Sequence, residues 1–380
     1  MEISFDFISI ITALGIAQGL FLSVAIWGAS SQNKKANKIL SITILFLTVS
    51  ISHGVLTYTN LYYHTPHLIL TGLPLSFTLG PLCLLYFYYL TNPDFRFHLK
   101  YSLLFLPFIL CIAALLPFYI KPGPEKLIIL SVFLNDGKLY IPSQVLGILS
   151  QVHMWVYLVI IWKKVSRHQE MIKKTFSTID KINLSWIHYF IGLYAFSFVF
   201  LLLATILRLT GNLSLGFERI VPLVVAVIFY FLGYRGFQQA PIFATASEKE
   251  TVHRKYERSS LNREEALQYK QELIDLMNQE KMYSDPSLTL NDLASELAVN
   301  RNLLSQIINE EIGQNFYDFV NTYRINEIRE RLKYKDSNDI PLLQLAMEAG
   351  FNSKATFNAV FKKVTGKTPS AYKKELQSSQ

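Results

Sequence analysis

The sequence predicts an all-α protein, in which a seven-helix transmembrane bundle precedes a cytoplasmic domain with two helix-turn-helix motifs. Three observations support this fold class. Seven apolar stretches fill the first 237 residues, and each is close to the roughly 20 residues that a helix needs to cross a bilayer. The mean hydropathy is +0.26, which is unusual for a soluble protein. Residues 285–380 contain an internal repeat with apolar residues at helical spacing.

Each apolar stretch is predicted to be a spanning helix, and together they form a transmembrane sensor domain over residues 1–237. The first stretch is not expected to be a signal peptide, because Glu2 and Asp6 lie where positive charge would be needed. The predicted spans are Phe5–Gly28, Ile39–Tyr58, Leu68–Leu90, Tyr101–Ile120, Gln144–Trp162, Ile187–Leu209 and Ile220–Phe237.

Basic residues in the connecting segments predict the orientation of this domain. The segments after the first, third and fifth spans contain Lys34, Lys35, Lys38, Arg96, Lys100, Lys163, Lys164, Arg167, Lys173, Lys174 and Lys181. The segments after the second, fourth and sixth spans contain only Lys121, Lys126, Lys138 and Arg219. Because basic loops remain in the cytoplasm, the N-terminus is expected outside and the C-terminus in the cytoplasm. An odd number of spans satisfies this arrangement.

A few residues inside the spans are candidates for a ligand or proton site, since burying polar groups in lipid is costly. They are His53, His153, His188 and Arg208. Ordinary contacts with an interface or a neighbouring helix are the alternative. A broken third span that lines a cavity, or simple helix packing, is suggested by Gly72, Pro74, Gly80 and Pro81. The outer segment 121–143 is compatible with a lid, a re-entrant piece or a hairpin.

Residues 238–284 are predicted to connect the two domains. The part from Gln238 to Ser260 is polar and has mixed charge without a period, so a flexible or partly ordered segment is expected. Asn262 is expected to cap a helix that ends near Gln279, with Glu265 placed as in a capping box. Its apolar side is expected to pack on its own domain or on a second copy; that side comprises Leu267, Leu273, Leu276 and Met277.

Residues 285–380 show one pattern twice, and a helix of about Phe316–Lys335 separates the two copies. Asn300 and Ser353 are good caps for the second helix of each motif, because their side-chain oxygens accept the free amides of a first turn. Apolar residues then follow at the same offsets from each cap: Leu304, Ile307 and Ile308 in one motif, and Phe357, Val360 and Phe361 in the other. Two helices joined by a tight turn, with one buried face, can place the second helix in a DNA major groove.

The second motif resembles the AraC-type (AraC/XylS) DNA-binding domain at Ala349–Ser353, Phe357, Phe361–Lys363 and Thr365–Tyr372. This resemblance covers about a quarter of the chain. The whole architecture resembles membrane-embedded AraC-type regulators of bacteria. It implies a transcriptional regulator in the inner (cytoplasmic) membrane, with double-stranded DNA and the lipid bilayer as its partners.

Residues that point away from the buried face are the candidate DNA contacts. In the first motif they are Arg301, Asn302, Ser305, Gln306 and Asn309. Asn and Gln can pair with the major-groove edge of adenine, and Arg301 suits a phosphate or a guanine. In the second motif they are Lys354, Ala355, Asn358, Ala359 and Lys362. Many relatives have a longer polar residue, often Arg, where this chain has Ala359, so the second motif is expected mainly to hold the DNA backbone through Lys354, Lys362 and Lys363.

Charge also bears on how the DNA-binding domain works. The formal net charge is +8, but Lys and Arg exceed Asp and Glu only in the apolar part, and residues 285–380 contain equal numbers of both. A single copy is therefore expected to bind DNA modestly, which favours a homodimer on paired sites. RNA polymerase and an unknown small-molecule or membrane-borne signal are further candidate partners.

The predicted function is a one-component regulator without enzymatic activity, cofactor or metal. The sequence has no H-E-x-x-H, G-x-S-x-G or P-loop motif, and Cys83 and Cys111 lie in apolar runs as small hydrophobes. One alternative is a membrane transporter or channel with a regulatory nucleic-acid-binding tail. Another keeps the regulator but releases its DNA-binding domain by cleavage near residues 240–260.

Overall fold

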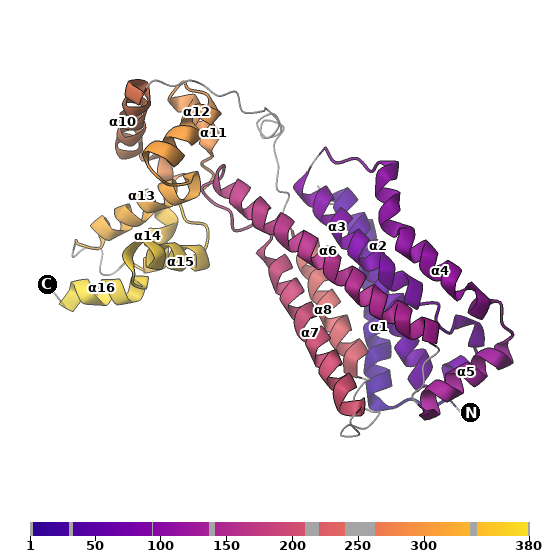
Figure 1. Cartoon of the computed structure of the whole chain (residues 1–380). Helices are drawn as coiled ribbons and strands as arrows, with labels where there is room; N and C mark the ends of the chain where they lie inside the picture. Colours follow the sequence, from indigo (N-terminus) through magenta and orange to yellow (C-terminus); the bar gives the residue numbers. More distant parts are fainter. Residues whose placement is uncertain are drawn as a thin grey trace. The chain divides into compact units, whose positions relative to one another are not determined.

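The computed structural model describes residues 3–29, 33–92, 94–136, 141–209, 220–239, 263–334 and 340–378. The regular elements in these ranges are helices, and Phe176 and Thr289 form an isolated antiparallel bridge. The chain divides into two compact units (Figure 1). Unit 1 comprises residues 1–165 and 184–245, and unit 2 comprises residues 166–183 and 246–380.

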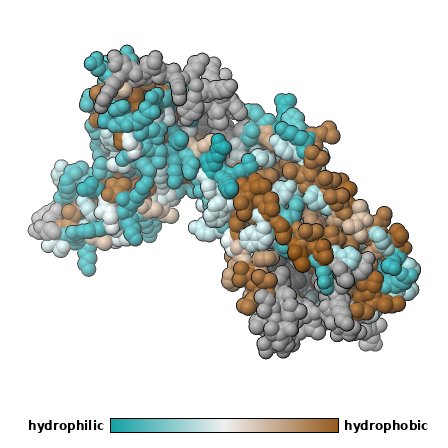
Figure 2. Space-filling model, viewed as in Figure 1, coloured by the Kyte–Doolittle hydropathy of each residue, from teal (hydrophilic) through white to brown (hydrophobic). Residues whose placement is uncertain are grey.

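Unit 1 is a bundle of helices whose visible surface carries large hydrophobic areas (Figure 2). Its short 3-10 turns are Leu61–Tyr63, Pro66–Leu68 and Leu99–Phe105. Its α-helices are α1 (Phe7–Gly28), α2 (Lys34–Tyr58), α3 (Leu73–Thr91), α4 (Leu106–Tyr119), α5 (Gly123–Asp136), α6 (Ile141–Lys173), α7 (Ser185–Leu209) and α8 (Ile220–Phe237). The last part of α6, Ser166–Lys173, belongs to unit 2.

Five helices in the described residues are long and apolar enough to cross a membrane, where seven were predicted. They are α1, α2, α3, the segment Leu99–Tyr119 and the segment Pro142–Lys173. The difference arises at the last two predicted spans. Within α7 the described apolar stretch is Ser185–Phe200, and several side chains of α8 before Tyr230 lie outside the described residues.

Small residues bring α1 and α2 close together. Ser23 Oγ donates to the Ser41 carbonyl oxygen at 3.0 Å, and Ser41 Oγ donates to the Ser23 carbonyl oxygen at 2.7 Å. A Cβ on Gly19 would lie 2.3 Å from Oγ1 of Thr48. Close helix approach through small residues and reciprocal polar contacts is typical of helices that pack in a membrane.

The third predicted span is broken at its start, where Leu68 ends a 3-10 turn and Leu70 has a positive φ of 64°, and it continues from Leu73 as the unbroken helix α3. Pro74 lies in the first turn of α3, where its missing amide costs nothing, and Pro81 lies inside the helix. A Cβ on Gly80 would lie 2.8 Å from the Tyr157 ring, so this glycine serves packing. The outer segment 121–143, for which a lid, a re-entrant piece or a hairpin was considered, contains helix α5.

Unit 2 contains the two helix-turn-helix motifs and the helices around them. Its helices are α10 (Arg263–Gln279), α11 (Leu290–Glu296), α12 (Arg301–Gln306), a π-helical turn (Ile307–Glu311), α13 (Phe316–Arg331), α14 (Leu342–Glu348), α15 (Lys354–Thr365) and α16 (Pro369–Ser378), with a short 3-10 turn (Met282–Ser284) before α11. Helix α13 is the predicted spacer, and it ends four residues earlier than expected because a turn follows Arg331.

Two hydrophobic cores lie on either side of α13. Phe319 and Val320 belong to the core of the first motif, and Ile325 and Ile328 belong to the core of the second. Helix α10 packs into the first core through Leu273 and Met277, so the connector helix lies against its own domain. The predicted cap Asn262 and the segment 240–260 lie outside the described residues.

Candidate nucleic-acid interface

Both predicted caps begin the second helix of their motif. Asn300 Oδ1 accepts from the Leu303 amide at 2.8 Å at the start of α12, and Ser353 Oγ accepts from the Thr356 amide at 3.1 Å at the start of α15. The preceding turn needs a left-handed residue in each motif, which is Ala298 with φ of 52° in the first and Gly350 with φ of 100° in the second. The sequence repeat therefore reflects a repeated backbone geometry.

The predicted buried face of each second helix is confirmed. In α12 and its π-helical continuation, Leu304, Ile307 and Ile308 are at most 1% exposed. In α15, Phe357, Val360 and Phe361 are at most 7% exposed. The opposite face of each helix is consequently available for contacts outside its motif.

The predicted contacts of the first motif lie on that opposite face. Asn302, Gln306 and Asn309 are exposed, whereas Arg301 and Ser305 are half-buried. Gln306 Nε2 donates to Glu310 Oε2 at 2.9 Å, and Asn309 Nδ2 donates to the Ser305 carbonyl oxygen at 2.6 Å. Arg301 Nη2 instead donates to Oγ1 of Thr175 at 2.6 Å, which lies in a distant part of the sequence.

The predicted contacts of the second motif are exposed without exception: Lys354, Ala355, Asn358, Ala359, Lys362 and Lys363. Lys363 forms an ion pair with Asp318 of α13, with 2.7 Å between Nζ and Oδ1. This lysine therefore ties α15 to α13, and its ammonium group already has an anionic partner in the domain. Lys354 begins α15, where a helix N-terminus adds its own attraction for a phosphate.

Sequence reasoning missed the residues that join the two motifs. Residues 166–183 were assigned to the membrane domain, but they pack in unit 2, where Ile172 and Ile179 enter the core of the second motif. The signal that could have found this contact is Arg324, a charged residue at helical spacing between the buried residues Val320 and Ile328. Such a position needs acceptors from elsewhere in the chain.

Arg324 places a buried positive charge at the junction, which is where residues 166–183 pack against α13. Its side chain is fully buried, and burial lowers its pKa to about 10. Tyr317 lies nearby, and its pKa is raised to about 12, chiefly by burial and then by the carboxylate of Asp180. A guanidinium with a lowered pKa remains charged at neutral pH, so the junction keeps a buried cation.

Unit 1 contains a cavity of about 470 Å³, which is in the size range of small-molecule sites. Among the described residues that line it, none is acidic or basic apart from one histidine, and the polar ones include His53, Thr57, Tyr62, Ser76, Ser150 and Gln151. His53 Nδ1 forms a hydrogen bond with the Tyr62 hydroxyl group. Tyr194 donates to Gln151 Oε1 at 2.9 Å. Of the candidate polar residues in the predicted spans, His53 is therefore the one that the cavity includes.

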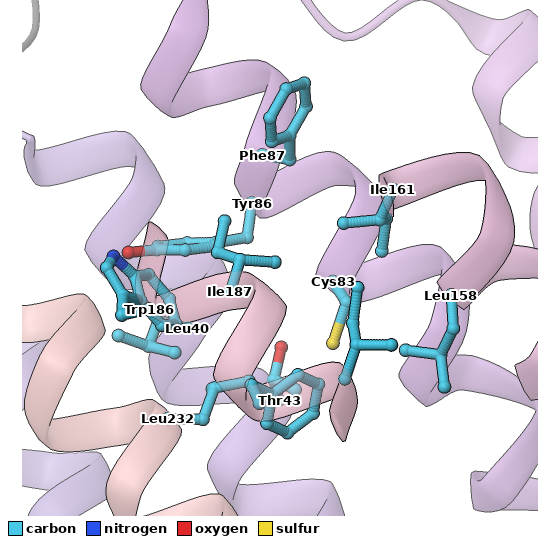
Figure 3. Close-up of a pocket in the computed structure, with 12 residues that line it drawn as sticks. Leu40, Thr43, Cys83, Tyr86, Phe87, Leu158, Ile161, Trp186, Ile187 and Leu232 are labelled. Carbon is cyan, nitrogen blue, oxygen red and sulfur yellow. The ribbon is translucent and has the colours of Figure 1, made fainter. Parts of the chain in front are cut away.

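His153 and His188 are not among the described residues that line this cavity. His153 lies against the rings of Phe77 and Tyr157, and His188 lies against the ring of Trp162. The side chain of Arg208 is outside the described residues. A second cavity, of about 20 Å³, has room for about one water molecule. Figure 3 shows its lining, in which Cys83, Tyr86 and Trp186 face a mostly apolar space.

Comparison with known proteins supports a DNA-binding domain in unit 2. A family described as "Helix-turn-helix domain" matches residues 293–375. The melibiose operon regulatory protein of Escherichia coli K12 is 31% identical over 93 residues, or 24% of this chain and 30% of that protein. An uncharacterized HTH-type transcriptional regulator of Staphylococcus aureus is 30% identical over 93 residues, or 12% of that protein.

The chain thus spans less than a third of the length of these relatives. A solved structure of a protein of unknown function from Listeria innocua is 30% identical, covers 28% of this chain and 94% of that chain, and has a TM-score of 0.25. The family match coincides with α11 to α16, in which the repeated caps and buried faces lie. The C-terminal part of this chain is accordingly a helix-turn-helix domain of the AraC type.

Proposed function

We propose that this protein is a membrane-bound, sequence-specific transcriptional regulator, which couples a signal at its apolar unit 1 to promoter binding by unit 2. The observation that supports this most is the presence, in one chain, of helices suited to cross a bilayer and of a repeated helix-turn-helix domain with exposed polar faces. The proposal includes α7 and α8 as two further spans, which gives seven. It places the protein in the inner (cytoplasmic) membrane, with the N-terminus outside and the C-terminus in the cytoplasm.

In this proposal, α12 reads bases and α15 holds the DNA backbone. Asn302 and Gln306 are exposed on α12, and their amides suit adenine in the major groove. Lys354 and Lys362 are exposed on α15, and Ala355 and Ala359 between them offer only apolar contacts. Equal numbers of acidic and basic residues in this domain favour a homodimer, since two linked copies raise the effective concentration at paired sites. Contact with RNA polymerase belongs to the same proposal.

The cavity of unit 1 is the proposed place for the signal. The part of the lining that the structure describes has hydroxyl groups, an imidazole and an amide but no carboxylate, lysine or arginine, and it suits a small neutral molecule with hydrogen-bonding groups. Such a molecule must favour one arrangement of the helices over another in order to transmit anything. The same cavity is the feature that favours the alternative, a transporter with a regulatory tail. Flux of small neutral solutes into vesicles that contain the protein would support that alternative.

Genome-wide crosslinking of the full-length protein tests the proposed function. We expect discrete binding sites for the wild type and loss of those sites in a variant with Asn302→Ala and Gln306→Ala. A matched control is Gln268→Ala with Gln271→Ala, because these exposed amides lie on α10, away from the reading helices. Equal occupancy in all three strains would remove α12 as the base-reading helix. Accessibility of a C-terminal tag from the outside would contradict the proposed orientation.

A further inference from the structure

The loop between α6 and α7, residues 174–184, lies in contact with the helix-turn-helix domain. The Ser177 amide donates to the Leu288 carbonyl oxygen at 3.2 Å, and the Leu290 amide donates to the Thr175 carbonyl oxygen at 2.9 Å. These two bonds flank the bridge between Phe176 and Thr289. The α6–α7 loop therefore pairs, as one short strand would, with the segment that leads into the first motif.

Arg324 fixes the middle of the α6–α7 loop. Its guanidinium donates to the Ser177 carbonyl oxygen at 3.3 Å, to Ser177 Oγ at 3.2 Å and to Thr178 Oγ1 at 3.3 Å. Its other acceptors are in the domain itself: the carbonyl oxygens of Tyr283 and Asp285, at 2.7 and 2.8 Å, and Asn321 Oδ1 at 3.2 Å. Half of the acceptors of this buried cation therefore come from the α6–α7 loop.

The two sides of the α6–α7 loop contact the starts of α12 and α15. On one side, Thr175 Oγ1 accepts from Arg301, the first residue of α12. On the other side, Asp180 Oδ1 accepts from Ser353 Oγ at 3.1 Å and from the Thr356 hydroxyl group. Ser353 is the cap of α15, and Thr356 lies in its first turn. One loop thus engages the start of α12 and the start of α15 together.

These contacts use the same kinds of donor that proteins use to bind a DNA backbone. Helix N-termini attract anions, and protein hydroxyl groups, arginines and helix N-termini are common donors to DNA phosphates. At α15 the anion is the carboxylate of Asp180. Its second oxygen, Oδ2, is buried and has no hydrogen-bond partner among the described residues. A buried oxygen without a donor costs free energy, so this carboxylate fills the position less well than it could.

We propose that the α6–α7 loop is an internal inhibitor of DNA binding, in which Asp180 occupies a phosphate position at α15 and Thr175 holds Arg301 away from DNA. The inference rests on the proposed function of unit 2 as a DNA reader. Binding of DNA then requires the loop to leave both helices. The loop directly continues α6 and leads into α7. A movement of either apolar helix would therefore pull on the loop through the covalent chain. Both DNA and the loop compete for the same hydroxyl groups and the same arginine.

A reversible crosslink between the loop and α15 tests this inference. The full-length chain carries Asp180→Cys and Thr356→Cys, and Cys83→Ala with Cys111→Ala removes the native thiols, which are buried. The side chains of residues 180 and 356 share a hydrogen bond, so cysteines at these two positions lie within reach of each other or of a short bifunctional thiol reagent that a reductant cleaves. The protein is held in lipid nanodiscs, and the probe is a duplex selected by the wild-type chain from a pool with a randomised core.

We expect the oxidised double variant to bind this duplex about tenfold more weakly than the reduced form, which is within the usual range of coupling between sites. The single-cysteine variants should not respond to the oxidant. Failure of both the oxidant and the short bifunctional thiol reagent to join the two cysteines would show that the loop is not docked. Equal binding by the oxidised and reduced forms would show that docking does not inhibit. Either result overturns the proposal.

A second variant distinguishes inhibition from a general charge effect. Asp180→Asn is compared with Asp275→Asn, which removes the same charge at an exposed position on α10. We expect Asp180→Asn to raise the affinity for the duplex above that of the wild type. The increase should be several-fold larger than the one that Asp275→Asn produces. Weaker binding by Asp180→Asn, or equal effects of both variants, would overturn the inhibitory role. Absence of binding by every form, even at low salt, would instead overturn the proposed function of unit 2.

Discussion

The carbonyl oxygen of Ser177 accepts a hydrogen bond from Nη1 of Arg324, although the two residues are 147 positions apart in the sequence. Ser177 is 1% exposed and Arg324 is fully buried. Ser177 also donates from Oγ to the Leu288 carbonyl oxygen at 2.7 Å. This pair joins the loop after α6 to the helix between the two motifs, and several consequences for stability and DNA binding follow from it.

The first prediction concerns Arg324 itself. Arg324→Met should destabilise unit 2 by about 3 kcal/mol, because removal of a buried partner leaves its acceptors unsatisfied. Hydrogen exchange of the amides of α13 in the full-length protein would measure the loss. Arg329→Met is the matched control, since Arg329 is half-buried on the same helix and contacts the Tyr372 hydroxyl group and Asn326. Equal effects of the two substitutions would contradict a special role for Arg324.

The second prediction separates folding from DNA reading with two asparagines that are two residues apart. Asn300→Ala should destabilise the first motif by about 1 kcal/mol, because it removes the cap of α12. Asn302→Ala should leave stability nearly unchanged and weaken binding to the selected duplex, since Asn302 is exposed on the reading face. Thermal unfolding and DNA binding of both variants would show this division. A large loss of stability in Asn302→Ala would refute it.

The third prediction compares two left-handed glycines. Both Gly350 and Gly313 have positive φ, so an alanine at either position is strained by roughly 1–2 kcal/mol. At Gly350 a Cβ would also lie 2.6 Å from the Tyr283 carbonyl oxygen, whereas nothing lies within 4 Å at Gly313. Gly350→Ala should therefore reduce the midpoint of thermal unfolding clearly more than Gly313→Ala. Similar midpoints would mean that the backbone contact relaxes without cost.

The sequence predicted those features of unit 2 that depend on local pattern. Cap residues and apolar positions at helical spacing act within one or two helical turns, so Asn300, Ser353 and both buried faces could be identified. The family match to residues 293–375 supports the same region as a helix-turn-helix domain. The assignment of individual DNA contacts is a prediction that the experiments above test.

Long-range contacts could not be read from the pattern. The α6–α7 loop is held by backbone groups of Thr175 and Ser177 and by short polar side chains such as Asp180. Short polar residues are common in any exposed loop, so its composition gave no sign of where it packs. Arg301 and Lys363 were expected to face DNA, yet Thr175 and Asp318 are their partners in the fold. Hydropathy predicted seven spans, and five helices in the described residues are long and apolar enough to cross a membrane.

The last prediction concerns how salt affects DNA binding by α15. Each lysine that neutralises a phosphate adds about one to the slope of log affinity against log salt. Lys354 is exposed at the start of α15, so Lys354→Ala should reduce that slope by about one. Lys363 is paired with Asp318, and Lys363→Ala should change the slope less while it loosens the contact between α15 and α13. Binding of the selected duplex over a range of salt concentrations would measure both slopes. If Lys363→Ala lowered the slope as much as Lys354→Ala, the ion pair with Asp318 would have to open when DNA binds.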